Sequence, residues 1–247
     1  MLRGLFANIP DVTKNLLIIN VLFFLASALL QGQGINLQGM LGMHYPGSNY
    51  FEPYQVITHF FMHANLSHIL FNMIGLIVFG SHLERVWGKK RYFIFYFITA
   101  IGAAILHFVV QGFEVYNLTG SWFPDIYINT PKDIFTTSIN FESPNAFEPA
   151  WRQAVGIFAT PVVGASGAVY GLLMAFALLF PNTKFMLLFP PIPVKAKWLA
   201  LALGIMALVQ GYQNNSGDSV AHFAHLGGML FAFIMIQIWK RDKSNFY

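Results

Sequence analysis

The stretch VVGASGAVYGLLMAFALLF, residues 162–180, contains no charged side chain. A helix that crosses the hydrocarbon core of a bilayer needs about 20 predominantly apolar residues. Most side chains here are apolar or small, and Ser166 and Tyr170 carry the only hydroxyl groups. We therefore predict a membrane-spanning helix over residues 162–180.

The remainder of the chain has the same character. Of its 247 residues, 56% are hydrophobic and only 10% are charged, whereas soluble domains average about 25% charged residues. The chain has no cysteine, which excludes disulfides and thiolate metal sites. We predict a single all-α integral membrane domain over residues 1–247, a bundle of six helices. The other five predicted spans are residues 15–30, 57–79, 92–110, 197–210 and 220–239.

The basic residues indicate how such a bundle would be oriented. Loops that face the cytoplasm carry an excess of Lys and Arg. With both termini in the cytoplasm, all 14 Lys and Arg except Lys132 and Arg152 lie on the inner side. Two large loops, residues 31–56 and 111–161, then lie outside, the second being an insertion of about 50 residues. No basic tract is typical of nucleic-acid binding, so the expected surroundings are lipid.

Two polar side chains stand out on the predicted spans. A serine is a weak nucleophile unless a base takes its proton. Counted at 1.5 Å per residue from the outer ends of their helices, Ser166 and His225 both lie about 6–8 Å deep. This matching depth, with the small residues beside them, makes a hydrogen bond between them geometrically possible. The alternatives are a serine bonded to its own helix within a Gly167–Gly171 packing motif, and His222 or His225 as buried structural donors.

Helix 57–79 adds further polar groups. His68 and Asn72 are spaced i, i+4 and so share one helix face, where both could donate hydrogen bonds to a developing oxyanion. A second interpretation is a zinc site made by His59, His63 and His222. No carboxylate accompanies these histidines inside the spans, so we expect no metal.

Four motifs resemble those of the rhomboid intramembrane proteases. They are HANLSHILFN at residues 63–72, GSHLERVWG at 80–88, GASG at 164–167 and AHFAHLGG at 221–228. They occur in the family's order and on the expected helices. The resemblance implies a six-helix rhomboid-like bundle with no cofactor, which cleaves single-span membrane proteins near the outer side of the bilayer.

The resemblance also implies residue roles. Ser166 would be the nucleophile and His225 the general base, and Tyr170 would pack against the His225 ring. His68, Asn72 and the Ser166 backbone N–H would form the oxyanion hole. By the same resemblance, Glu84 and Arg85 would organise the cytoplasmic loop structurally.

One departure and one alternative accompany the resemblance. Many relatives carry Trp-Arg just before the second helix, where this chain reads Tyr54-Gln55. The alternative function is an inactive relative that binds membrane proteins; such relatives typically lose the serine or the histidine, whereas this chain keeps both. We expect a multi-pass protein of a bacterial inner (plasma) membrane. The substrate, the role of the 111–161 loop and the oligomeric state stay open.

Overall fold

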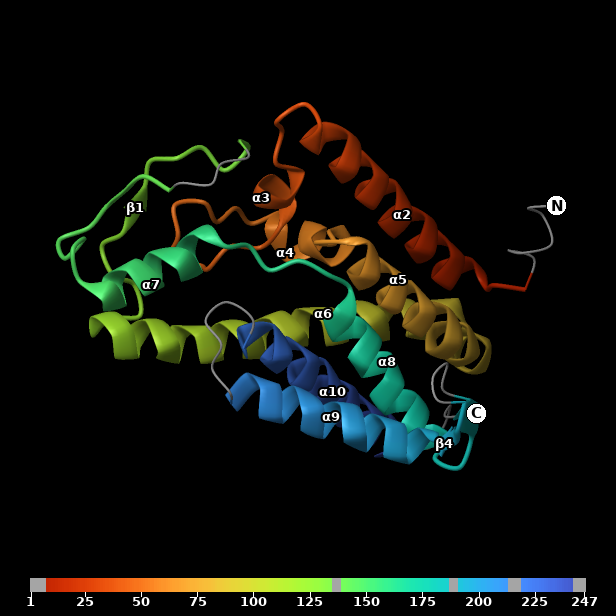
Figure 1. Ribbon diagram of the computed structural model, residues 1–247. Coiled ribbons are helices and arrows are strands. Elements are labelled where there is room, and N and C mark those ends of the chain that lie inside the picture. The colour runs from red at the N-terminus through yellow and green to blue at the C-terminus, as the bar shows by residue number, and fades with distance from the viewer. Residues whose placement is uncertain (1–7, 135–138, 187–190, 213–218, 242–247) are drawn as a thin grey trace.

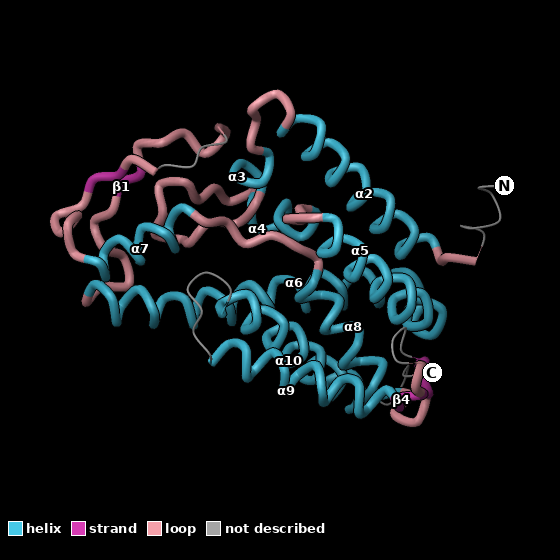
Figure 2. The backbone as a smooth tube through the Cα atoms, viewed as in Figure 1, coloured by secondary structure: helices cyan, strands magenta, loops and turns pink. Residues whose placement is uncertain are grey.

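The protein is built mainly of helices packed side by side (Figure 1). A computed structural model describes residues 8–134, 139–186, 191–212 and 219–241. Figure 2 shows that the short strands of the described residues lie near the ends of the bundle. The bundle helices are α2 (Asp11–Gln31), α5 (Leu66–Gly75), the π-helical turn η2 (Leu76–Gly80), α6 (Ser81–Thr119), α8 (Ser166–Leu179), α9 (Ala196–Tyr212) and α10 (Ser219–Arg241).

The outer faces of these helices fit a lipid environment. In the part of the chain that the structure describes, three stretches are long and apolar enough to cross a membrane, namely Asp11–Gln31, Leu66–Thr119 and His222–Lys240, and α8 and α9 are shorter apolar helices. Large aliphatic side chains are exposed on these helices, as at Leu29 (72%) and Ile205 (53%). Water would disfavour such a surface, whereas hydrocarbon does not. The chain is therefore a helical membrane protein.

The helix boundaries differ from those predicted over residues 57–79. The chain there forms helix α4 (Gln55–Thr58), the 3₁₀ turn η1 (His59–Phe61) and a loop before α5 begins. The side chain of Asn65 starts α5 by accepting a 2.8 Å hydrogen bond from the backbone N–H of His68, which satisfies one of the free N–H groups at a helix start. His59 and His63 thus precede the helix.

The run from α5 into α6 bends sharply at Gly88. This residue has φ +76° and ψ 166° inside what is otherwise continuous helix, a conformation that glycine adopts without steric cost. The predicted gap between the second and third spans therefore reduces to a tight break. The helix after it continues to Thr119, beyond the predicted end at residue 110. Residues 111–119 are helix and not part of a loop.

Glu84 joins α6 to the start of α2. Pro10, at the N-cap position of α2, makes no side-chain cap. The buried Glu84 carboxylate instead accepts hydrogen bonds from the backbone N–H groups of Val12 and Thr13, at 2.9 and 2.8 Å, and from the Thr13 hydroxyl at 2.8 Å. A carboxylate there also interacts favourably with the positive end of the helix dipole. Glu84 is thus a cap supplied from a distant part of the chain.

Replacing Glu84 by alanine should destabilise the bundle by about 3 kcal/mol or more, because it leaves three donors unpaired and hydrogen bonds to charged groups contribute about 1.5–3 kcal/mol each. For a protein of this size that corresponds to a fall in Tm of about 6–12 °C. The matched control is Glu142→Ala, because the Glu142 carboxylate is exposed and bonds Asn129. Equal Tm values for the two variants in thermal unfolding would contradict the role of Glu84 as a cap.

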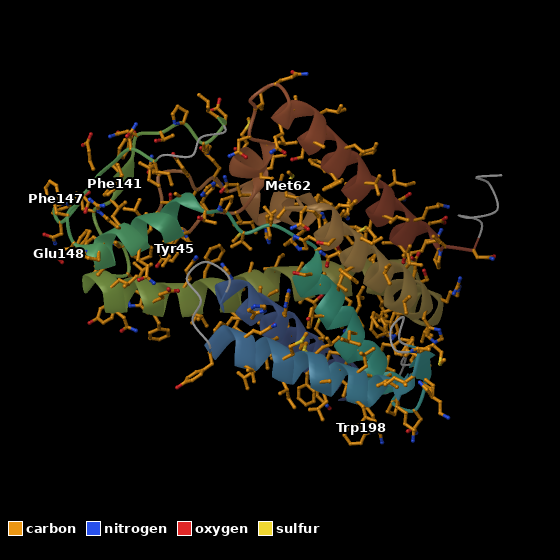
Figure 3. The ribbon with its side chains drawn as sticks, in the orientation of Figure 1. Tyr45, Met62, Phe141, Phe147, Glu148 and Trp198 are labelled. Atoms are coloured by element: carbon orange, nitrogen blue, oxygen red, sulfur yellow. The ribbon has the colours of Figure 1, made fainter. Side chains whose placement is uncertain are left out.

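The two long loops pack together into one unit, which we call the outer assembly (residues 32–54, 120–134 and 139–161). The first loop contains α3 (Leu37–Leu41), and the second contains the β1–β2 ribbon (Tyr127–Ile128 and Phe141–Glu142) and helix α7 (Pro149–Ala159). Tyr45 lies beside α7 (Figure 3), and its ring centroid is 5.2 Å from that of Phe158 in this helix. The core that these loops share with the end of α6 comprises Tyr45, Tyr50, Val115, Ile126, Ile128, Trp151, Ala154, Val155 and Phe158. The insertion is therefore a folded partner of the first loop.

Gln55, at the start of α4, holds the first loop together. Its buried side chain accepts from the backbone N–H groups of His44 and Glu52, at 3.3 and 3.1 Å. It donates to the carbonyls of Met40 and Tyr50, both at 3.1 Å. The position that departs from the Trp-Arg pattern is thus a hydrogen-bonding centre for its loop.

The outer assembly should lose stability in mild acid because of His44. Its fully buried ring lies 2.9 Å from the Gly39 carbonyl and 3.3 Å from that of Phe158. Burial lowers the pKa of His44 below its ordinary 6.5, and the two carbonyls only partly oppose this shift. The unfolded chain then binds the proton first, so stability present above about pH 6.5 is lost as the pH falls toward the lowered pKa. Between about pH 8 and pH 5, the Tm of the wild type should fall more steeply with decreasing pH than the Tm of His44→Gln. Equal slopes of Tm against pH would refute this.

Candidate active site

Ser166 and His225 meet between helices α8 and α10. The Ser166 hydroxyl and Nε2 of His225 are 3.0 Å apart, a hydrogen bond between half-buried side chains. Ser166 is the first residue of α8, whereas the prediction placed it a turn inside a helix beginning at Val162. Residues 160–165 approach as non-helical chain instead. The expected contact is present, although the depth estimate behind it used the wrong helix start.

Glycine brings the backbones close enough for that contact. A Cβ atom added to Gly228 of α10 would lie 1.9 Å from the carbonyl oxygen of Gly167 in α8. One added to Gly167 would lie 2.4 Å from Cβ of Ala103 in α6. Close backbone approach through small residues is typical of helix packing in membranes. The glycines beside each polar residue therefore set the distance between Ser166 and His225.

Gly228→Ala should reduce the activity of the site by about 100-fold, because α8 and α10 must separate and a misplacement of 1 Å can cost that much. Its matched control is Gly204→Ala in α9. A Cβ atom there would meet only the flexible end of Met229, at 3.3 Å. Labelling of the serine by a fluorophosphonate would report both variants. Wild-type labelling of Gly228→Ala would show that this close approach does not position the pair.

Tyr170 orients the histidine. Its ring is stacked on that of His225, with centroids 4.1 Å apart and an angle of 2° between the planes. Within the described residues, the buried Nδ1 of His225 has no hydrogen-bond partner. The imidazole is therefore held by stacking and by Ser166, without a carboxylate at its second nitrogen.

His68 and Asn72 lie on the face of α5 that packs against α8 and the chain before it. A Cβ atom at Gly164 would lie 2.7 Å from Nε2 of His68, and one at Gly75 would lie 2.5 Å from Val169. Gly164 has φ +123°, which favours glycine and leaves room for the imidazole. Positions 68, 72 and 75 share one helix face, so Asn72 lies between two points of contact that bracket the serine in sequence.

The amide of Asn72 is a donor that the resting fold does not use. The residue is 4% exposed, and Nδ2 has no hydrogen-bond partner among the described residues. An unpaired buried amide costs about 1–3 kcal/mol, so its retention calls for a reason. A small cavity of about 30 Å³, lined in part by His59, Gly164, Ser166 and Ala224, adjoins the serine and has room for about one water molecule.

His59, His63 and His222 do not form a metal-binding cluster among the described residues. Nδ1 of His59 lies 2.7 Å from the Gln55 carbonyl oxygen, and His222 lies on α10 with its ring 5.9 Å from that of His225. His63 is buried with its ring 5.0 Å from that of His68. In the described parts of the chain, no three His, Cys, Asp or Glu side chains form a cluster able to hold a metal ion. The zinc interpretation thus finds no ligand set there.

Sequence reasoning missed three positions that shape this site. The motifs contain Gly228 and Gly164 but do not indicate which atoms these glycines approach. The departure at Tyr54-Gln55 does not indicate that Gln55 bonds its loop. A glycine beside a polar residue on a span was the available signal for Gly228. The packing of Gly164 against His68 had no such signal, because it joins a loop to a separate helix.

The chain is similar in sequence to known proteins. The family model of the rhomboid domain matches residues 50–241. Rhomboid-like protein 16, chloroplastic, of Arabidopsis thaliana is 28% identical over 191 residues, covering 77% of this chain and 49% of that protein. Rhomboid protease AarA of Providencia stuartii is 26% identical over 184 residues, covering 70% and 51%. The putative rhomboid protease YdcA of Bacillus subtilis is 24% identical over 195 residues, covering 78% and 71%.

These matches agree with the architecture and with the motifs. The chain spans about half the length of several curated relatives. The matched domain nevertheless covers most of this chain and includes both the serine and the histidine. Since all four motifs quoted from the sequence also fall inside that domain, the resemblance is confirmed, and the chain belongs to the rhomboid family.

Proposed function

We propose that this protein is an intramembrane serine endopeptidase with a Ser166–His225 dyad. The observation that carries the proposal is the 3.0 Å hydrogen bond between Oγ of Ser166 and Nε2 of His225, with the imidazole stacked on Tyr170. A serine bonded to a base that a third group orients is the arrangement that nucleophilic catalysis requires. Here the orienting group is an aromatic ring.

The proposed reaction follows from these positions. Ser166 Oγ attacks the scissile carbonyl carbon while Nε2 of His225 takes the hydroxyl proton. The carbonyl oxygen becomes an oxyanion, and the C–N bond then breaks as His225 returns the proton to the departing amine. Water, deprotonated by His225, attacks the resulting ester and releases the second product and the free serine.

Donors for the oxyanion are proposed on two sides of the serine. Ser166 opens α8, and the first N–H groups of a helix lack partners within that helix and carry partial positive charge. Asn72 and His68 would donate from α5. Such donors act where charge develops in the transition state, and each contributes about 3 kcal/mol to lowering the barrier.

Substrate and location belong to the same proposal. The substrates would be single-span membrane proteins, cut near the outer side of the bilayer. The proposed six-crossing topology with inner termini rests on the distribution of Lys and Arg and on the family resemblance. We place the protein in a bacterial plasma membrane as part of the same proposal. AarA and YdcA are named as proteases, whereas other relatives are named as chloroplastic or mitochondrial rhomboid-like proteins.

The test is cleavage of a single-span substrate by the purified protein in liposomes, with fluorophosphonate labelling in parallel. Cleavage within or beside the substrate span, together with labelling at Ser166, is the expected result. If neither cleavage nor labelling occurs across several substrates, while a thermal unfolding transition shows that the bundle is folded, the result would support the inactive binder instead. Labelling without cleavage would retain the dyad and reject the chosen substrates.

A further inference from the structure

A long apolar groove runs along the surface of the bundle, and its lining residues include neither Ser166 nor His225. It lies between α8, α9 and α10, which are neighbours in Figure 1, and has a volume of about 520 Å³. Met174, Leu201, Ile205, Leu208 and Leu226 are among its lining residues. Lys197 and Leu208 mark the two extremes of its α9 wall, which at 1.5 Å per residue makes the wall about 16 Å long.

One end of the groove is basic. Lys197 lines it, and the strands β3 (Lys184–Met186) and β4 (Pro193–Lys195) lead directly into α9. Lys184 and Lys195 are directly opposite each other in this ribbon, although like charges in that position are unfavourable. Among the described residues, none of these three exposed lysines forms an ion pair. The cluster therefore lacks an acidic partner within the described fold.

Trp198 marks the same end as an interfacial position. It lines the groove, is 55% exposed and lies next to the ribbon at the end of α9, as Figure 3 shows. Its ring centroid is 5.3 Å from the Lys197 ammonium. Tryptophan is enriched at the level of lipid headgroups. A wall of about 16 Å starting there is about half of a hydrocarbon core of about 30 Å, the depth of one leaflet.

We propose that this groove binds one anionic phospholipid, with an acyl chain along α9 and the phosphate at Lys184, Lys195 and Lys197. The apolar wall accounts for the chain, and the unpaired cluster accounts for the negative headgroup. A basic residue close to anionic lipid contributes about 1 kcal/mol. The proposal does not depend on catalysis, because none of the three lysines belongs to the dyad or its donors.

The test compares phosphatidylglycerol with phosphatidylcholine of the same acyl chains, added to the full-length protein in detergent and counted by native mass spectrometry. One molecule of phosphatidylglycerol should be retained in preference to phosphatidylcholine. Lys197→Gln should weaken the affinity for phosphatidylglycerol by about fivefold. The triple variant, with Gln at positions 184, 195 and 197, should weaken it by on the order of 100-fold. The matched control is Lys90→Gln, an exposed lysine outside the groove.

A second variant tests the part of the proposal that concerns the acyl chain. Gly204 lines the groove, and its Cβ direction meets only the end of Met229. Gly204→Leu should therefore fill the groove and reduce retention while all lysines remain and serine labelling persists. Equal retention of the two lipids by the wild type, or retention of phosphatidylglycerol by the triple variant at wild-type strength, would overturn the proposal.

Discussion

Ser166→Ala should lower the rate of substrate cleavage by at least about 10³-fold, and His225→Ala should do the same. The serine supplies the atom that forms the covalent bond, and Nε2 of His225, 3.0 Å away, is the base placed to accept its proton. Because the two residues act as a unit, the double variant should be no slower than either single variant. The measurement is initial rate of product release from a single-span substrate in liposomes.

The control for this result is a second serine that does not belong to the dyad. Ser81 is a buried residue at the start of α6, and Ser81→Ala should retain cleavage. Thermal unfolding of each variant separates lost chemistry from lost fold. A folded Ser166→Ala protein that still cleaves at the wild-type rate would exclude the dyad, whatever the family of the chain.

Asn72→Ala should reduce cleavage by about 10²–10³-fold, the usual effect of removing one oxyanion donor. The same change should leave Tm equal or slightly raised. Nδ2 of Asn72 is buried without a partner among the described residues, so no hydrogen bond donated by this amide would be lost. Burying an unpaired amide is itself costly. Activity and stability should therefore move independently, which a purely structural asparagine would not allow.

Asn20→Ala provides the matched comparison. Asn20 is fully buried in α2, and its amide donates to the Leu16 carbonyl at 2.7 Å. Its loss should affect stability more than cleavage. If Asn72→Ala lowers Tm and activity together, as a misfolded variant would, the assignment of Asn72 as an oxyanion donor fails. Cleavage rates and Tm from the same preparations decide between the two outcomes.

Local patterns predicted which residues would form the candidate site. Ser166, His225, His68 and Asn72 stand out on apolar helices because a polar group in hydrocarbon is costly and rare. The helical repeat places positions 68 and 72 on one face. Tyr170, one turn after the serine, was expected against the histidine from the family resemblance, and the ring stacking agrees. These inferences required only composition, spacing and motif order.

The first residues of the helices were harder to predict from the sequence, because the groups that cap them can come from separate segments of the chain. Residues 57–65 are apolar enough to continue a helix, yet Asn65 caps α5 and the chain before it turns. The start of α2 depends on Glu84, far along the chain. The outer assembly likewise forms from two loops that share one core. Hydropathy does not encode such pairings between distant segments.

The sequence by itself determined that this chain is an apolar, helical membrane protein with rhomboid motifs, since hydrophobicity and spacing are local properties. Only the tertiary structure decided that Ser166 begins its helix, that Gly228 sets the separation of α8 and α10, and that Gln55 holds the first loop. The physical reason is that each of these depends on atoms that approach within about 3 Å across distant parts of the chain, where close packing and hydrogen bonding act.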